Sequence, residues 1–279
     1  MSSLAELSQR LARLREISGI MTAMKSLSLV ETRKLGRFIG HQRDMLTNIE
    51  TAAADFLRHF PVEAGAKSQA VILLLVGSER GFCGNFNERV VAALDRLAHW
   101  EQAPALLVIG RRLGAKLESR PGGITLLEGA TVTEEVPAAL DRLIDAVNAA
   151  RRRFADGGVA LYSLAHQAES EPTLKRLVPI TPAQHMRYAS APDLQLAPLE
   201  FFAELLDQHL LAALYGLLYE SLAAEQRQRL AHMEHAIDRL DQTLAQLALK
   251  RNALRQEKIV EEIEVILSSE QAFVKAVAA

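Results

Sequence analysis

The sequence predicts an α/β (Rossmann-like) domain inserted between two long helices that pair as an antiparallel coiled coil. Three observations predict this fold class. Residues 1–60 and 199–279 lack proline and repeat apolar residues at spacings of three and four, as coiled-coil helices do. Between them, short apolar runs alternate with amphipathic helical patterns, which is typical of a parallel sheet covered by helices. The predicted parts are therefore residues 1–60, 68–195 and 199–279.

The first part is predicted to be one continuous helix. Three interior glycines each weaken it by roughly 1 kcal/mol relative to alanine. They are expected to mark a close helix–helix contact or a bend: Gly19, Gly36 and Gly40. The apolar stripe is expected to shift once and then resume, through Leu4, Leu7, Leu11 and Leu14, then Ile17, Met21, Met24 and Leu27, then Leu35, Ile39, Leu46, Ile49, Ala53 and Phe56.

The middle part has the pattern of a parallel sheet. Continuous apolar runs bounded by glycine or proline predict strands that are buried on both faces. These runs are "AVILLLV", "PALLVIG", "GGVALYSLA" and, more weakly, "ITLLEG". Helical patterns lie between them, in "FNERVVAALDRLAHW" and "EEVPAALDRLIDAVNAARRRFA". The proline-dotted residues 181–198 predict an irregular connection out of this domain.

The last part predicts a helix on the order of 100 Å long, at about 1.5 Å per residue. Its seam is Leu230, Met233, Ile237, Leu240, Leu244 and Leu247, after which the register slips to Ile259, Ile263 and Ile266. Its end, "SEQAFVKAVAA", is expected to project beyond the shorter first helix. An isolated tip of this composition would expose apolar surface unless a partner enclosed it. The pattern therefore predicts an elongated component of a larger assembly.

Composition narrows the class of protein. The formal charge of −2 over 279 residues argues against nucleic acid or an anionic membrane as the main partner. The single cysteine, Cys83, excludes an intramolecular disulfide and fits a reducing compartment. No uncharged run approaches the ~20 residues of a membrane span, and the N-terminus has no apolar signal core. A soluble, intracellular bacterial protein is therefore expected.

The stretch "GSERGFCGNFN" follows a predicted strand, where a phosphate-binding loop would lie. Its glycines, however, have neither the Rossmann nor the P-loop spacing, so turn geometry is the better interpretation. Cys83 invites a nucleophile hypothesis, but no histidine can be assigned as its base, and a buried structural cysteine is favoured. His232 and His235 are too few ligands for a metal site. We expect no catalytic residue, cofactor or metal.

Three stretches point to one family. "SQRLARLREISGIMTAMKSLSLVETRKL" is similar to a helix pattern I-x-K-A-M-x-M-V-A-x-x-K, and "VGSERGFCGNFN" is similar to S-x-D-R-G-L-C-G-x-x-N. The long C-terminal stretch is similar to E-x-x-R-M-x-A-M followed by N-x-x-R-Q-x-x-I-T-x-E. Together, in order and over nearly the whole chain, they resemble the gamma subunit of F-type ATP synthases, the central rotor shaft.

The resemblance implies a non-catalytic subunit that couples ion flow to ATP chemistry. One copy per complex would stand in a ring of alternating alpha and beta subunits. Its foot would rest on the membrane rotor ring beside the epsilon subunit, at the cytoplasmic face of the bacterial inner membrane. Each orientation of the asymmetric shaft would favour one conformation of each beta subunit. No nucleic acid partner is implied.

The resemblance also implies site residues. Arg255 and Gln256 match the R-Q pair that contacts a beta-subunit loop, a task that suits the guanidinium fork. Met24, with Lys25 beside it, matches the neck where the shaft meets the ring. The foot signature is matched by Arg80, Gly81, Cys83, Gly84 and Asn87.

Several positions depart from the family pattern. Thr22 replaces a lysine, Lys25 stands where an acid is common, Glu79 replaces an aspartate and Val260 replaces a threonine of the beta-loop network. These departures favour a divergent, alternative branch, for which a sodium-type enzyme is the candidate. The ion itself is selected in the membrane ring.

Two alternative functions stay open at the level of sequence. A free-standing α/β nucleotide-binding protein with helical arms would require a phosphate loop of proper spacing. A coiled-coil scaffold or nucleic-acid arm would bind its partner with strong salt dependence if that partner were nucleic acid.

Overall fold

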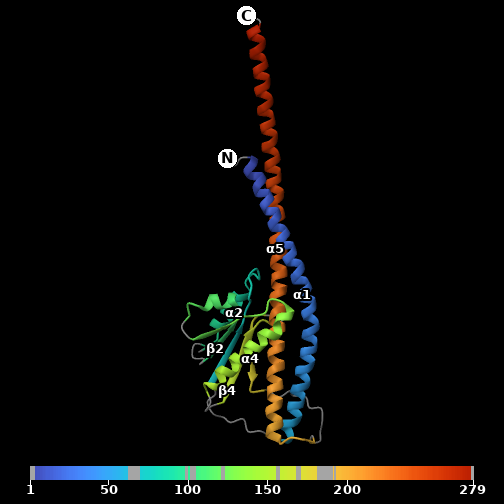
Figure 1. The fold of residues 1–279 in the computed structure, drawn as a ribbon, viewed down its shortest axis with the longest axis vertical. Coiled ribbons are helices and arrows are strands. Elements are labelled where there is room, and N and C mark those ends of the chain that lie inside the picture. The colour runs from blue at the N-terminus through green and yellow to red at the C-terminus, as the bar shows by residue number, and fades with distance from the viewer. Residues whose placement is uncertain are drawn as a thin grey trace. The chain divides into compact units, whose positions relative to one another are not determined.

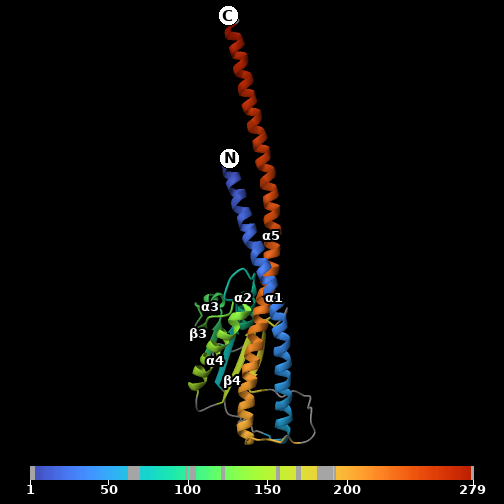
Figure 2. The same ribbon diagram turned by 45° about the vertical axis from the view of Figure 1, so that its right-hand side comes forward.

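The computed structural model describes residues 4–61, 70–97, 100, 105–120, 123–154, 158–167, 171–180, 191 and 193–277, with only the helical backbone for residues 268–277. Its contacts divide the chain into two compact units. The first unit is Met1–Leu27 with Ala231–Ala279, and the second is Ser28–Leu230. The helices α1 (Leu4–His59) and α5 (Pro198–Val277) contribute to both units (Figures 1 and 2). The two predicted long helices are therefore confirmed.

Helix α1 buries much of the predicted stripe. Leu7 and Leu11 are buried in the first unit, and Leu35, Ile39 and Phe56 are buried in the second. The spacing of these positions fits the 3.6-residue turn of an α-helix. The buried residues therefore lie on one side of α1, which packs against the rest of the chain.

The predicted shift of the stripe is right at Met21 and Met24, which are half-buried. It is wrong at Ile17 and Leu27, which are 46% and 67% exposed. Ser18, Lys25 and Ser28 lie on the covered side in their place. The buried positions keep the heptad spacing, even where they hold polar residues. The position of a residue along the helix decides whether it faces the partner helix, whatever its side chain.

The interior glycines of α1 do not mark a close contact within the chain. A Cβ added at Gly19, Gly36 or Gly40 would meet no atom within 4 Å among the residues that the structure describes. These glycines lie on the exposed side of α1. They therefore lower helix propensity without a packing gain inside the chain.

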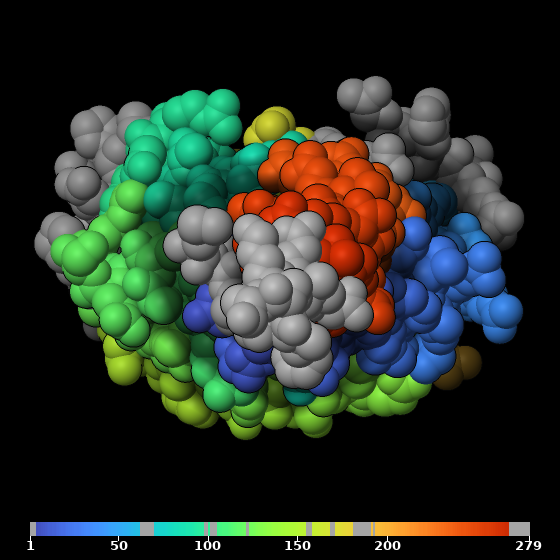
Figure 3. All heavy atoms as spheres, turned by 90° about the horizontal axis from the view of Figure 1, so that it is seen from above, coloured from blue at the N-terminus to red at the C-terminus, as the bar shows by residue number. Residues whose placement is uncertain are grey.

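Helices α1 and α5 run antiparallel. In the second unit, Arg43 pairs with Glu220 at 2.8 Å, and Glu50 lies 3.6 Å from His209. In the first unit, Lys25 pairs with Glu234 at 3.0 Å. Numbers rise along one helix as they fall along the other, as predicted. Figure 3 shows the beginning of α1, in dark blue, beside the red part of α5.

The sheet has five strands in the order β3-β2-β1-β4-β5. The strands are β1 (Ala70–Val76), β2 (Ala105–Ile109), β3 (Ile124–Leu127), β4 (Val159–Ala165) and β5 (Thr173–Val178). The first four are parallel, and all four correspond to predicted runs. At the centre of the sheet, Leu74 of β1 is paired with Leu107 of β2 on one side and with Ser163 of β4 on the other. Buried parallel strands require apolar side chains on both faces, which is why these runs are continuous.

Strand β5 is antiparallel to β4, and the sequence did not predict it. Its first four residues are exposed, and two of them are Lys175 and Arg176. Charged residues are common on edge strands, where they discourage pairing with other chains. A continuous run of apolar residues indicates a central strand. It does not indicate an edge strand with charged residues, such as β5.

The helices of the α/β part are α2 (Phe86–Asp95), α3 (Arg111–Leu117) and α4 (Val136–Arg152), with the short helix η2 (Thr133–Glu135) before α4. The predicted α2 and α4 are confirmed. Helix α3 was missed because its seven residues carry only one repeat of the apolar stripe, at Leu113 and Leu117. The predicted irregular connection falls mostly on residues 181–190 and 192, outside the described residues.

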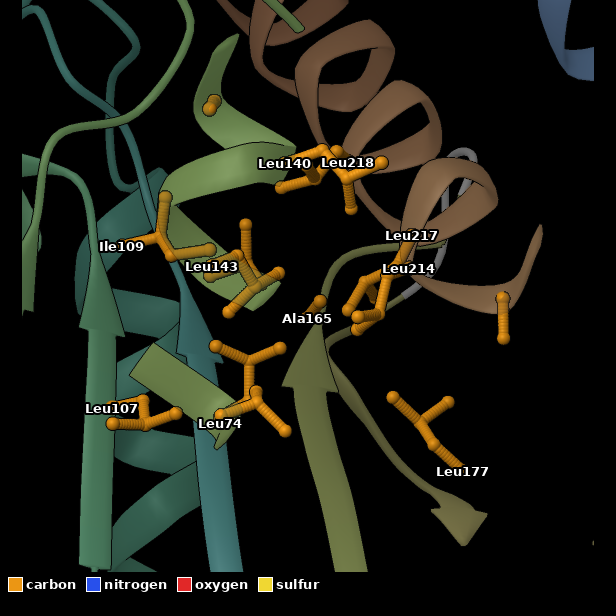
Figure 4. Packing of buried hydrophobic residues seen from close by; sticks show 14 of the residues in the cluster. Leu74, Leu107, Ile109, Leu140, Leu143, Ala165, Leu177, Leu214, Leu217 and Leu218 are labelled. Carbon is orange, nitrogen blue, oxygen red and sulfur yellow. The ribbon is translucent and has the colours of Figure 1, made fainter. Parts of the chain in front are cut away.

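The sheet has a different apolar core on each face. On one face, Leu73, Leu75 and Val108 pack against α2 and α3. On the other face, strands, α4 and the two long helices share a larger core. Figure 4 shows side chains of the sheet, α4 and α5 directed toward one another: Leu74, Leu107, Ile109, Leu140, Leu143, Ala165, Leu177, Leu214, Leu217 and Leu218. The long helices are therefore integral to the domain and complete its second layer.

Helix α5 contains one window long and apolar enough for a membrane span, with a mean hydropathy of 1.2 within Pro198–Leu267. The apolar part of α5 that includes Leu214, Leu218 and Leu222 belongs to the core of the α/β domain. A buried core helix has the same composition as a membrane span. That window is 33% buried, so packing within the chain accounts for part of its hydropathy.

Candidate functional site

The loop Gly77–Asn87, called the signature loop below, leaves the carboxyl end of β1 and enters the first turn of α2. The buried side chain of Asn87 closes it. Its Oδ1 accepts a hydrogen bond from the Ser78 N–H at 2.9 Å, and its Nδ2 donates to the Ser78 Oγ at 2.7 Å. Gly84 has a φ of 58°, which glycine adopts at little cost. Gly84 therefore serves turn geometry, as predicted for the glycines of this loop, and Asn87 closes the same turn.

Cys83 lies inside this turn. Its side chain is buried, and its Sγ donates to the Ser78 Oγ at 3.3 Å. Burial raises the pKa of the thiol, which disfavours the nucleophilic thiolate. The prediction of a buried structural cysteine is confirmed.

Gly77 allows helix α3 to approach β1. A Cβ at Gly77 would lie 2.3 Å from the Cβ of Leu113. Gly110, at the start of α3, has a φ of 101°, and a Cβ there would lie 2.6 Å from the Gly77 carbonyl oxygen. The backbone and α3 thus fill the space next to Gly77 and Gly110.

The carboxylate of Glu79 lies at the carboxyl edge of the sheet, where an α/β nucleotide-binding protein would bind a phosphate. Its carboxylate accepts hydrogen bonds from the Gly129 N–H at 2.9 Å and the Arg111 N–H at 3.1 Å, and it pairs with the Arg111 guanidinium. Burial would raise the pKa of Glu79, but these hydrogen bonds outweigh it and hold the pKa below its ordinary value. An ionised side chain of the protein already takes the N–H groups that could bind a phosphate.

The crevice between β1 and β4, where doubly wound folds bind ligands, is also filled. Cys83, Phe86 and Ala224 of α5 form a buried cluster there. The ring of His166, which follows β4, stacks on Phe86 at a centroid distance of 4.1 Å, and its Nε2 lies 2.9 Å from the Phe86 carbonyl oxygen. The geometry therefore disfavours the nucleotide-binding hypothesis.

Helix α5 contacts the signature loop directly. Arg229 is 7% exposed, donates from Nε to the Gly81 carbonyl oxygen at 3.3 Å, and pairs with Glu225 one turn earlier. Gln228 donates to the Asn85 Oδ1 at 3.3 Å. Burial raises the pKa of Glu225 to about 7, against the opposing charge of Arg229. A buried guanidinium with a carboxylate partner thus joins α5 to the loop.

Helix α1 contacts the short helix η2, which follows β3 at the same edge of the sheet. Glu31 accepts from the Thr133 N–H at 2.9 Å and the Thr133 Oγ1 at 2.8 Å. Burial would raise the pKa of Glu31, but the Thr133 hydrogen bonds hold it below its ordinary value. Lys34 bridges Glu31 and Glu134 at 3.1 and 2.9 Å. The carboxyl edge of the sheet therefore holds the two long helices.

Sequence reasoning missed Glu31 and Arg229. The sequence did hold a signal for both residues. Each is a charged side chain on the side of its helix that otherwise carries buried apolar residues. Arg80 and Gly81 were predicted. Arg80 is exposed and lines a polar cavity of about 260 Å³, and Gly81 supplies the carbonyl that Arg229 contacts.

The candidate partner residues lie in the first unit. Met24 is half-buried, and Lys25 pairs with Glu234 of α5. Arg255 and Gln256 are exposed on α5, about 30 Å further along the axis than Glu234, at about 1.5 Å per residue. The structure does not bring the two pairs together. The side chains of residues 268–279, which include the predicted apolar tip, lie outside the described residues.

Comparisons with known proteins agree on one family. A family model described as ATP synthase matches residues 3–273. A gamma chain of ATP synthase from Rubrobacter xylanophilus is 25% identical over 98% of this chain and 99% of its own length. One from Geotalea daltonii is 24% identical over the same shares.

Solved structures show the same fold. The rotor of Euglena gracilis mitochondrial ATP synthase matches with a TM-score of 0.64 and 12% identity, over 92% of this chain and 98% of that one. A chain from the central stalk and c-ring of Tetrahymena thermophila mitochondrial ATP synthase matches with a TM-score of 0.51 and 19% identity, over 78% of this chain and 99% of that one.

Proposed function

This chain belongs to the ATP synthase gamma-chain family, and on that premise we propose that it is the central rotor shaft that couples ion translocation to ATP synthesis and hydrolysis. Its long antiparallel helices would be the shaft, and the α/β domain would be the foot. The coupling would work through differential contacts, since each orientation of an asymmetric shaft favours one conformation of each surrounding subunit.

One observation carries the proposal that the chain itself is not an enzyme. The carboxyl edge of its sheet, where an α/β enzyme would bind its ligand, is occupied by Glu79, by the Cys83 cluster and by contacts with α1 and α5. Nucleotides would be bound and converted on the beta subunits.

The exposed surface of the first unit supports a partner that surrounds it. On α1, Ile17, Ile20 and Leu27 are exposed. On α5, the exposed apolar residues are Leu249, Ile259, Val260, Ile263, Val265, Ile266 and Leu267. Apolar surface of this extent is typical of an interaction site. We assign it to the ring of alpha and beta subunits, with Arg255 and Gln256 at a beta-subunit loop and Met24 and Lys25 at the neck.

The chain would be part of a membrane-associated complex. In the proposed assembly, one copy stands at the cytoplasmic face of the bacterial inner membrane, with its foot on the membrane rotor ring beside the epsilon subunit. The gamma-chain relatives from bacteria support this placement.

Reconstitution tests the proposal. Membranes depleted of their own gamma chain should regain ATP-driven ion pumping when this chain is added with alpha and beta subunits. The purified chain alone should neither hydrolyse ATP nor bind it saturably. ATP hydrolysis by the isolated chain, or no restored pumping with a properly folded chain, would overturn the assignment.

A further inference from the structure

The signature loop lies where the α/β domain touches α5, and this placement gives the loop a role. We propose that the loop is a grip on the shaft, with Arg229 as the positioning residue that transmits torque between the α/β domain and α5. The inference rests on the proposed function and names the contact through which the foot would turn the shaft.

The apolar core alone resists sliding poorly. Leu214, Leu217 and Leu218 of α5 pack on the sheet and α4, and they hold the domain and the helix together. The hydrophobic effect is non-directional, however, and packed helices slide past one another in shear motions. A rotor must resist such sliding under load. Directional bonds between the two parts would fix their register.

The bonds of Arg229 have this direction. The Arg229 guanidinium reaches out of α5 to the Gly81 carbonyl oxygen at 3.3 Å, and Glu225 holds it in place from the preceding turn. Both side chains are at most 8% exposed, so water competes little for their hydrogen bonds. A guanidinium is suited to this task because its planar fork can bond two acceptors at fixed angles.

The rest of the loop is built to carry the load onward into the sheet. Gly81 lies between Glu79, which is bonded to Arg111 and Gly129, and Cys83, which packs under Ala224 of α5. Asn87 ties the loop back to Ser78 at the end of β1. A force on Gly81 is therefore passed to β1, to the start of α3 and to the loop after β3.

The only cysteine of the chain reports on the grip. Cys83 lies two residues from Gly81 and is buried, so a thiol reagent can reach it only when the loop opens. The test variant is Glu225→Leu with Arg229→Met. It removes the whole ion pair, because deleting one partner would leave the other charge buried and unpaired. The control is Glu220→Leu with Arg43→Met, which removes a more exposed ion pair between α1 and α5 that does not involve the signature loop.

In the full-length chain, Cys83 of the test variant should react about tenfold faster than in the wild type, as expected for losing one charge-assisted hydrogen bond. The control variant should react at the wild-type rate. Equal Cys83 rates in all three proteins would overturn the grip, and they would leave the proposed shaft function untouched.

Coupling is the second measurement. In the reconstituted complex, the test variant should retain ATP hydrolysis and lose ion pumping per ATP, whereas the control variant should keep both. A cross-link between Asn85→Cys and Gln228→Cys, in a Cys83→Ser background of the test variant, should restore pumping. A loop that opens without any loss of pumping would overturn the role in torque. A wild-type chain that fails to restore pumping would overturn the proposed function instead.

Discussion

The two units use the same pair of helices in different ways. In the second unit, α5 is buried on several sides from Ala212 to Ala224, since α1, α4 and the sheet surround it. In the first unit, the buried apolar side chains among the described residues are Leu7, Leu11 and Met233. The second unit is thus stabilised by the chain itself. The first unit leaves apolar surface for another protein.

The largest expected effect tests this contrast on one helix. Leu214→Ala in the second unit should lower the free energy of unfolding by about 2–5 kcal/mol, because it opens a cavity in a fully buried position. Leu249→Ala in the first unit, where the side chain is 72% exposed, should change it by about 0.5 kcal/mol or less. Urea unfolding of the full chain measures both. Similar losses would mean that the first unit packs as tightly as the second.

A buried charge should show the next largest effect. Burial raises the pKa of Glu225 from 4.5 to about 7 in the folded chain. A raised pKa in the folded state means that the folded chain binds the proton more tightly. The stability from this group is therefore complete below pH 4.5 and is lost as the pH rises to 7. The loss is about 3 kcal/mol, from about 1.4 kcal/mol per pKa unit.

The measurement is urea unfolding of the wild type and of Glu225→Gln at pH 5 and pH 8. The wild type should lose more stability than the variant over this interval. Glu234→Gln in the first unit is the control, since its exposed pair with Lys25 is worth at most about 1 kcal/mol. If Glu225→Gln kept the whole pH dependence of the wild type, the ion pair with Arg229 would outweigh burial.

The third prediction concerns a double substitution that should impair coupling without lowering the stability of the chain. Arg255→Ala with Gln256→Ala should lower ATP-driven pumping per ATP about tenfold, as expected for losing a charge-assisted contact with a partner. Both side chains are exposed, so the unfolding transition should stay where it is. Unchanged pumping would mean that a chain with Val260 in place of threonine no longer uses this contact.

The sequence predicted the parts of the fold that rest on repetition. Long seams at spacings of three and four predicted α1 and α5, and continuous apolar runs predicted the four parallel strands. It missed α3 and β5, because one is too short for a period and the other is a polar edge. It also misplaced the seam at Ile17 and Leu27, since apolar character was followed in preference to heptad position.

The candidate site divides in the same way. The role of Gly84 in the turn could be predicted, because backbone geometry limits which residues fit there. The contact of Arg229 with Gly81 could not, since it joins residues 148 apart in the chain. The distance between Lys25 and Arg255 along the shaft also required the structure.

The smallest effect concerns the helix backbone, where the two units should agree. Gly19 in the first unit and Gly36 in the second are both exposed, and an added Cβ at either would meet no described atom within 4 Å. Gly19→Ala and Gly36→Ala should each stabilise the isolated chain by about 0.5–1 kcal/mol, because alanine loses less backbone entropy in a helix. Thermal unfolding measures the gain. If only Gly36→Ala stabilised the chain, the first part of α1 would not be helical in the free chain. The first unit would then form only inside its ring of partners.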